Sequence, residues 1–122
     1  MCIRDSTRII AFTSEGSSKA IANYGAVGAA KAALEAISRN MALEFATLGI
    51  KTNCIQAGVT DTESLRRIPG SEMLIKQAKL KNPGARLTTP EDVADVVYLL
   101  STNEAKWING TVIKVDGGES LS

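Results

Sequence analysis

Histidine is absent from all 122 residues of the chain. It is the usual base at neutral pH and the commonest metal ligand in proteins. A Ser-His-Asp triad, a Cys-His pair and an HExxH zinc site are therefore excluded within this sequence, and we expect no metal site. Any acid–base chemistry must use tyrosine, lysine or carboxylate groups.

Neither sign of charge is in excess, because 14 basic residues stand against 13 acidic ones and leave a net charge of +1. Basic runs are missing, and aromatic residues make up only 4% of the chain. Nothing in this composition attracts a phosphate backbone or an anionic membrane. Nucleic-acid and membrane partners are therefore not expected.

Cysteine is scarce, and long apolar runs are missing. Cys2 and Cys54 stand far apart without a CxxC pairing, which favours a reducing, cytoplasmic setting. The longest apolar run falls far short of the roughly 18 residues that a membrane-spanning helix needs. The first residues lack the basic and then apolar layout of a signal peptide. Residues 1–6, MCIRDS, fit poorly with the rest of the sequence, and we interpret them as a non-native leader.

Short apolar runs bounded by turn residues predict three strands. They cover residues 8–14, 50–56 and 111–115. The first is apolar throughout, which is typical of a strand covered on both faces in a parallel sheet. The last ends in Asp-Gly-Gly, whose glycines we expect in a tight turn with positive φ.

Two helices are predicted between these strands, and a third within a long excursion. Residues 24–48 are rich in Ala, Leu and Met, with Glu35 and Glu44 expected to face outward and Gly49 placed as a C-terminal cap. Thr-Pro-Glu-Asp at residues 89–92 supplies an N-cap and a first-turn proline for a helix that runs to about residue 100. Strands and helices that alternate in this way indicate a parallel α/β sheet with right-handed crossovers.

The excursion covers residues 57–88 and includes one predicted helix, SEMLIKQAKLK, at residues 71–81. Connections this long in compact domains are usually functional lids or disordered linkers. The helix inside it favours the lid, and we expect this segment to cover a substrate.

Tyr24 and Lys31 stand out in the small-residue stretch NYGAVGAAKAAL, residues 23–34. Seven residues are two helical turns, which brings the two side chains to within about 20° of the same direction. A neighbouring ammonium favours the phenolate, so the pair could transfer a proton. On spacing alone, a half-buried tyrosine and a solvated lysine are the commoner explanation.

The remaining motifs favour the catalytic interpretation of Tyr24 and Lys31. The sequence from Arg8 to Ser122 resembles the C-terminal half of a short-chain dehydrogenase/reductase. In that family the lysine commonly follows the tyrosine by four residues, where this chain has Gly28. The longer Tyr-x6-Lys spacing is similar to the branch of NADPH-using enoyl-acyl-carrier-protein reductases. The later motifs AGVTDT and INGTVIKVDGG resemble the loop after the family's sixth strand and its final strand.

The resemblance implies roles for individual residues. Tyr24 would hydrogen-bond the carbonyl of an enoyl thioester, and Lys31 would hold the hydroxyls of the nicotinamide ribose. The loop after the second predicted strand would lie against the nicotinamide carboxamide and the phosphates. Its expected contacts are Ala57, Gly58, Val59 and Thr62.

The helper residue beside Tyr24 is left open by the sequence. Counting back thirteen residues, the usual family spacing, gives Ala11, whereas alignment on the Gly16 turn puts Thr13 and Ser14 in that region. We take Ser14 as the catalytic candidate and Thr13 as a cofactor contact.

As a whole, the resemblance implies a Rossmann-type doubly wound parallel sheet with three α/β/α layers, of which residues 7–122 form the C-terminal part. It also implies NADPH or NADH as cofactor, an enoyl thioester of acyl carrier protein or coenzyme A as substrate, and a homotetramer. No glycine-rich phosphate-binding run is present, so we expect the N-terminal dinucleotide-binding half to be missing and the isolated chain to be inactive.

Two alternatives remain open. One is a carbonyl reductase or alcohol dehydrogenase of the same superfamily. The other is a non-catalytic α/β fragment that supplies three strands to a partner.

Overall fold

The computed structural model of the chain describes residues 7–122, so the predicted leader at residues 1–6 lies outside the described residues. Three parallel strands form one sheet in the order β1-β2-β3. They are β1 (Arg8–Thr13), β2 (Lys51–Ala57) and β3 (Val112–Val115). Each bound lies within one residue of its predicted place. The predicted parallel α/β sheet is confirmed.

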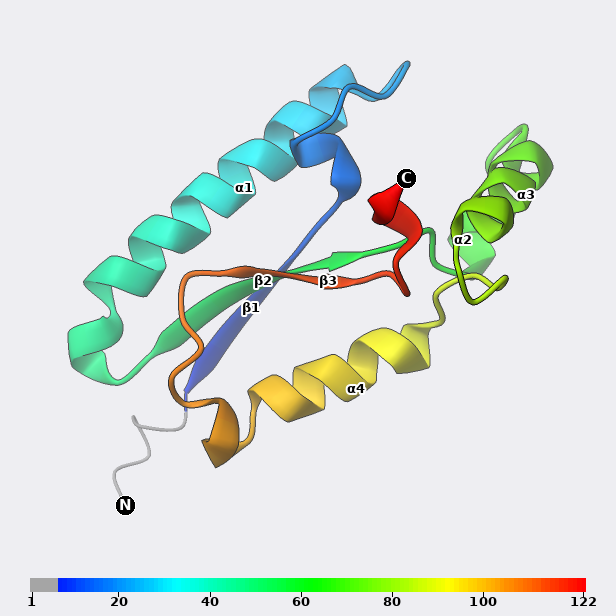
Figure 1. The fold of residues 1–122 in the computed structure, drawn as a ribbon. Helices are drawn as coiled ribbons and strands as arrows, with labels where there is room; N and C mark the ends of the chain where they lie inside the picture. Colours follow the sequence, from blue (N-terminus) through cyan, green and yellow to red (C-terminus); the bar gives the residue numbers. More distant parts are fainter. Residues whose placement is uncertain (1–6) are drawn as a thin grey trace.

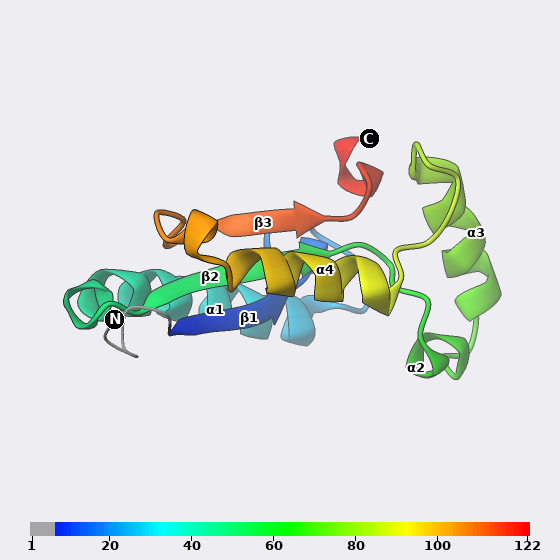
Figure 2. The ribbon, with the colours of Figure 1, turned by 90° about the horizontal axis from the view of Figure 1, so that it is seen from below.

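A long helix covers each face of the sheet. In Figures 1 and 2, α1 (Gly25–Glu44) and α4 (Pro90–Leu100) lie on opposite sides of the strands. A parallel sheet has two apolar faces to bury, and the two crossovers supply one helix to each. The predicted arrangement of three α/β/α layers is therefore confirmed for this part of the chain.

The amino end of α4 shows why the sequence signal there was strong. Thr89 Oγ1 accepts the Asp92 N–H at 3.2 Å, and Asp92 Oδ2 accepts the Thr89 N–H at 2.8 Å. This reciprocal capping box, with Pro90 at the first position, fixes the helix start where it was predicted. Arg86 also binds Asp92, and their hydrogen bond holds the pKa of Asp92 well below its ordinary value.

The carboxyl end of α1 is shorter than predicted. The α-helix ends at Glu44, and residues 46–48 continue as a 3-10 turn. Gly49 then takes a φ of 76°, which confirms the predicted left-handed cap. Glu44 is exposed as expected.

The main apolar core lies between the sheet and α4. It is built around Ile55, Leu100 and Ala105, and Ile55 is fully buried. Packed around these three are partly buried side chains from β1, β3 and α4: Ile10, Val93, Val96, Val97, Ile113 and Val115. The opposite side of β2 is more polar, because buried Thr52, Cys54 and Gln56 alternate with the residues that face α4.

The excursion forms a small unit of its own beyond the carboxyl ends of the strands (Figures 1 and 2). It contains α2 (Glu63–Arg66) and α3 (Ser71–Lys81), and the bounds of α3 match the prediction. The short helix α2 was not predicted, because four residues are too few to show a helical repeat. Leu65, Ala78 and Leu87 form a separate apolar cluster that holds the segment together.

Candidate active site

A cavity of about 480 Å³ lies where the excursion faces the carboxyl ends of β1 and β2. Ligands of open parallel sheets bind at this edge. The cavity lining contains six of the eight predicted site residues. They are Ser14, Tyr24, Ala57, Gly58, Val59 and Thr62. Residues that are far apart in the sequence are therefore brought together in one place.

The hydroxyl groups of Ser14 and Tyr24 lie 3.0 Å apart, with either one able to donate. Ser14 comes directly after β1, and Tyr24 stands at the amino end of α1. Asn23 just before it has a φ of 63°, a left-handed conformation that asparagine tolerates better than most residues. Both hydroxyls belong to half-buried side chains in the cavity wall. Because one hydroxyl hydrogen lies in the bond between them, the other is left to donate to an oxygen atom of a ligand.

Lys31 is held just outside the cavity lining. Its Nζ donates to the backbone carbonyl of Phe12 at 2.9 Å, so the ammonium lies against the end of β1. An ammonium has three donors, and this contact occupies one of them. The remaining two are available to a ligand.

Gly28 explains in part why the lysine is not four residues after Tyr24. A Cβ at this position would lie 2.6 Å from the carbonyl oxygen of Gly16, closer than real Cβ contacts come. The backbone of α1 therefore approaches the Gly16 turn too closely for any side chain. Lysine at position 28 is incompatible with this packing, whereas position 31 is free to carry it.

The loop after β2 forms the opposite wall of the cavity. A Cβ at Gly58 would lie 2.6 Å from Glu119 Oε2 and 2.8 Å from Thr88 Oγ1, so this position has no room for a side chain. Thr62 lines the cavity but also caps α2, because its Oγ1 accepts the Leu65 N–H at 3.2 Å. Its hydroxyl hydrogen is still available to a ligand.

Glu119 is a buried carboxyl in the cavity wall that sequence reasoning missed. Its Oε2 accepts the Val59 N–H at 2.9 Å, and only 6% of the residue is exposed. Burial raises the pKa of Glu119, with smaller contributions in the same direction from Asp116 and Glu15. The residue lies in a 3-10 turn at residues 119–121, and no motif points to it.

Thr13 is not among the residues that line the cavity. Its side chain is buried, and Oγ1 donates to Glu35 Oε1 at 2.6 Å. This contact corrects the expectation that Glu35 faces outward. The α1 side of the sheet is polar at this point, so a carboxylate on the packed side of the helix finds hydroxyl partners there. Whether Thr13 touches a cofactor stays a prediction.

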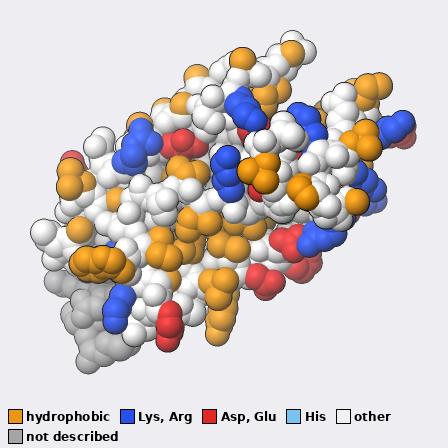
Figure 3. All heavy atoms as spheres, in the orientation of Figure 1, with side chains coloured by type: hydrophobic (Ala, Val, Ile, Leu, Met, Phe, Trp, Pro, Cys, Tyr) orange, Lys and Arg blue, Asp and Glu red, His pale blue; other side chains and the backbone are white. Residues whose placement is uncertain are grey.

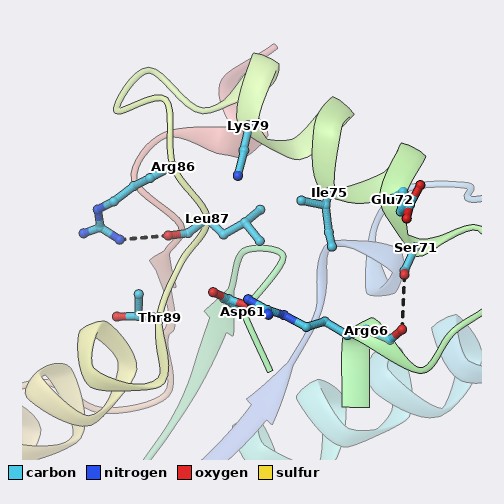
Figure 4. Close-up of a pocket in the computed structure, with 9 residues that line it drawn as sticks. All are labelled: Asp61, Arg66, Ser71, Glu72, Ile75, Lys79, Arg86, Leu87 and Thr89. Atoms are coloured by element: carbon cyan, nitrogen blue, oxygen red, sulfur yellow. Dashed lines mark hydrogen bonds and ion pairs between the residues drawn. The ribbon is translucent and has the colours of Figure 1, made fainter. Parts of the chain in front are cut away.

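A second hollow of about 510 Å³ lies between α2, α3 and residues 86–89 (Figure 4). The basic side chains around it are Arg66, Lys79 and Arg86, of which Arg66 is paired with Asp61 at 2.8 Å and Arg86 with Asp92 at 2.6 Å. None of the predicted site residues lines this hollow. It is therefore distinct from the candidate active site.

Residues 7–122 lack two further features, a membrane-spanning helix and a cluster of metal-binding side chains. None of the described helices is long and apolar enough to cross a membrane. In the same residues, no group of three or more acidic or cysteine side chains is placed to hold a metal ion.

A parallel sheet with a helix on each face, and polar residues gathered at its carboxyl edge, defines an α/β protein of the Rossmann type. A profile of the family described as enoyl-(acyl carrier protein) reductase matches residues 1–120. The chain belongs to this family of short-chain dehydrogenases/reductases.

Individual relatives agree with this assignment. The peroxisomal 2,4-dienoyl-CoA reductase of Saccharomyces cerevisiae is 42% identical over 95 residues, which are 77% of this chain and 32% of the relative. The enoyl-[acyl-carrier-protein] reductase [NADH] FabI of Aquifex aeolicus is 34% identical over 110 residues, which are 90% of this chain and 41% of the relative. The chain spans between about a third and about half the length of the curated relatives it matches.

A solved structure extends the likeness to three dimensions. The Bacillus cereus enoyl-acyl carrier protein reductase, crystallised with NADP+ and indole naphthyridinone, is similar with a TM-score of 0.89 at 30% identity. The likeness covers 95% of this chain and 45% of that one. The fold of residues 7–122 is thus that of a Rossmann-type reductase.

Proposed function

We propose that residues 7–122 form the C-terminal, catalytic part of an NADPH- or NADH-dependent reductase that acts on the double bond of a trans-2-enoyl thioester. The observation that carries the proposal is the pair of hydroxyls, Ser14 Oγ and Tyr24 Oη, 3.0 Å apart in one cavity. The same cavity is lined by apolar side chains of the excursion: Val59, Leu65, Ile68 and Leu74. A polar end and an apolar wall suit a thioester carbonyl with its acyl chain.

The two hydroxyls would stabilise the charge that develops on the substrate. Hydride addition to the β-carbon would place negative charge on the thioester oxygen, and a proton would then have to reach the α-carbon to complete the reduction. Tyr24, with Ser14 beside it, would donate to that oxygen, and such preorganised donors are often the largest single contribution to catalysis. The apolar side chains of the excursion would exclude water from the reacting carbons.

The residues present fit one end of a dinucleotide. The loop after β2 lines the cavity and would lie against the nicotinamide ring, and Lys31 has two ammonium donors for ribose hydroxyls. NADPH or NADH would supply the hydride when bound. The sequence carries no glycine-rich turn for the phosphates, so that part of the site would come from outside residues 7–122.

A chimera tests the proposal. Residues 7–122 replace the matching region of the Aquifex aeolicus enoyl reductase, and oxidation of the cofactor is followed by its absorbance. We expect oxidation with an enoyl thioester, presented on coenzyme A or on acyl carrier protein. Reduction of a β-keto thioester in place of the enoyl one would instead establish a carbonyl reductase. A folded, cofactor-binding chimera that turns over neither substrate would favour the non-catalytic alternative.

We also propose that the complete protein is a homo-oligomer, with α1 at one interface. Support comes from exposed apolar side chains, because Ile37 is 56% exposed and Leu43 is 77% exposed on that helix. Further hydrophobic side chains are exposed over the sheet and α4 in the view of Figure 3. Light scattering of the chimera and of its Leu43→Glu variant tests this. A mass equal to one chain for the parent chimera would contradict it.

A further inference from the structure

Glu35 receives two hydroxyl groups on one carboxylate oxygen. Thr13 Oγ1 donates to Glu35 Oε1 at 2.6 Å, and Ser17 Oγ donates to the same atom at 2.5 Å. Thr13 comes directly before Ser14, and Ser17 comes three residues after it. One side chain of α1 therefore holds the turn on both sides of Ser14.

Other contacts join the same turn to α1. Lys31, one helical turn before Glu35, donates to the carbonyl of Phe12 at 2.9 Å, and the backbone of Gly28 packs directly on Gly16. Within the turn, the Ser17 N–H donates to the Ser14 carbonyl at 3.0 Å. The helix that begins directly after Tyr24 thus also fixes the backbone that carries Ser14.

Ser14 itself depends on these contacts. Its hydroxyl has one hydrogen bond among the described residues, the one to Tyr24. Nothing else in the described structure anchors that side chain, so its place is set by the backbone of the turn. A misplacement of about 1 Å in a reactive pair can slow a reaction on the order of 10²-fold.

We propose that Glu35 is a positioning residue for Ser14, and so for the contact of Ser14 with Tyr24. It acts by fixing the Thr13–Ser17 turn, not by touching the substrate. The inference rests on the proposed function only in taking Ser14 and Tyr24 as the reactive pair.

The experiment uses the chimera and measures kcat, KM and melting temperature for each variant. Glu35→Ala should lower kcat about 10- to 100-fold, within the range expected for a displaced reactive group, and leave KM for the thioester nearly unchanged. Glu35→Gln keeps an acceptor oxygen and should retain most of the activity. Glu44→Ala is the matched control, because Glu44 lies exposed on the same helix. It should leave kcat unchanged.

A double-variant comparison with Ser14 shows whether Glu35 positions Ser14 or only stabilises the fold. In a Ser14→Ala background, Glu35→Ala should cause no further loss of kcat, because the group that it positions is already gone. The inference would be overturned if the kcat losses of the two single variants multiplied in the double variant. It would also be overturned if Glu35→Ala melted earlier but kept the kcat of the parent. If Glu35→Ala fails to fold, the Thr13→Val, Ser17→Ala double variant removes the two donors instead and should give the same loss.

The outcome does not depend on the substrate class. If the chimera reduces a ketone and no enoyl thioester, the proposed substrate is wrong, and the same comparison is made with the ketone. Coupling between Glu35 and Ser14 would then still support the inference, and its absence would still refute it.

Discussion

Gly58 and Glu119 are in direct contact across the wall of the candidate active site. A Cβ added to Gly58 would lie 2.6 Å from Glu119 Oε2, and that same oxygen accepts the N–H of Val59 at 2.9 Å. The end of β2 and the turn after β3 therefore pack closely against each other. This contact fixes the loop that faces Tyr24.

Gly58→Ala should therefore destabilise the chimera by about 1–3 kcal/mol, the usual cost of overpacking a filled site. Thr88 Oγ1 at 2.8 Å and Asp116 Cβ at 3.0 Å would have to shift, as would Glu119 Oε2, to admit the new methyl group. Gly25→Ala is the matched control, since a Cβ there meets nothing within 4 Å. Thermal unfolding should show an earlier transition for the first variant only. Equal melting temperatures for the two variants would contradict this tight packing.

Glu119→Gln should make stability less sensitive to pH. Burial raises the pKa of Glu119 above its ordinary value of 4.5, and Asp116 and Glu15 add to this, whereas the Val59 N–H and Lys81 oppose it. A raised folded-state pKa means that stability is fully present below the unfolded-state pKa and is lost as pH rises through the folded-state pKa.

Glutamine still accepts the Val59 N–H but carries no charge. The melting temperature of the Glu119→Gln variant, compared with the parent chimera, should therefore improve as the pH rises above 4.5, the ordinary pKa of the carboxyl. A difference in melting temperature that stays constant with pH would show that the carboxylate at position 119 is not destabilising.

Thr89→Ala tests the strongest local signal in the sequence. It removes the acceptor of the Asp92 N–H, and the loss of such a cap typically costs about 1 kcal/mol. Thr89→Ser keeps the hydroxyl and serves as the control. We expect an earlier thermal transition for alanine and little change for serine. Unchanged stability of the alanine variant would mean that Pro90 and Asp92 define the helix start without the cap.

Local sequence signals of this kind account for the parts of the fold that could be predicted from the sequence. The bounds of α3 and α4 follow from residues next to each other in the sequence, and the strands follow from short apolar runs. The exact partner of Tyr24 does not, because Ser14 reaches it only through the fold of an intervening turn. Glu35 was misplaced for a related reason. A carboxylate on a helix is normally solvated, and only the hydroxyls of Thr13 and Ser17 make its inward position favourable.

Lys31→Ala should weaken cofactor binding in the chimera as well as slow turnover. The change removes the donors proposed for the ribose hydroxyls and also the contact with Phe12 at 2.9 Å. Losing hydrogen bonds from a charged donor should raise the dissociation constant for NADPH or NADH about tenfold or more. Quenching of nicotinamide fluorescence measures this directly. Lys76→Ala, at an exposed position of α3, should bind the cofactor like the parent. Unaltered binding by the Lys31 variant would remove Lys31 from the cofactor site.

Tyr24→Phe gives the most direct test of the proposed chemistry. The ring packs on Gly16, where a Cβ would overlap it, so phenylalanine keeps the packing and loses only the hydroxyl. The chimera should therefore fold and bind cofactor as before. Removing one oxyanion-stabilising donor costs about 2.7–4 kcal/mol in the transition state, so kcat should fall about 10²–10³-fold with little change in KM.

Tyr98→Phe is the control for this variant, because Tyr98 is 72% exposed on α4, in the layer on the other side of the sheet from α1. It should turn over like the parent. Ser14→Ala should lower kcat less than Tyr24→Phe, since Tyr24 would remain as a donor to the substrate oxygen after its neighbour is lost. The reverse order would make Ser14 the principal donor and Tyr24 its support. Full activity in both variants would show that the hydroxyl pair takes no part in the reaction, and the proposed function would then have lost the observation that carries it.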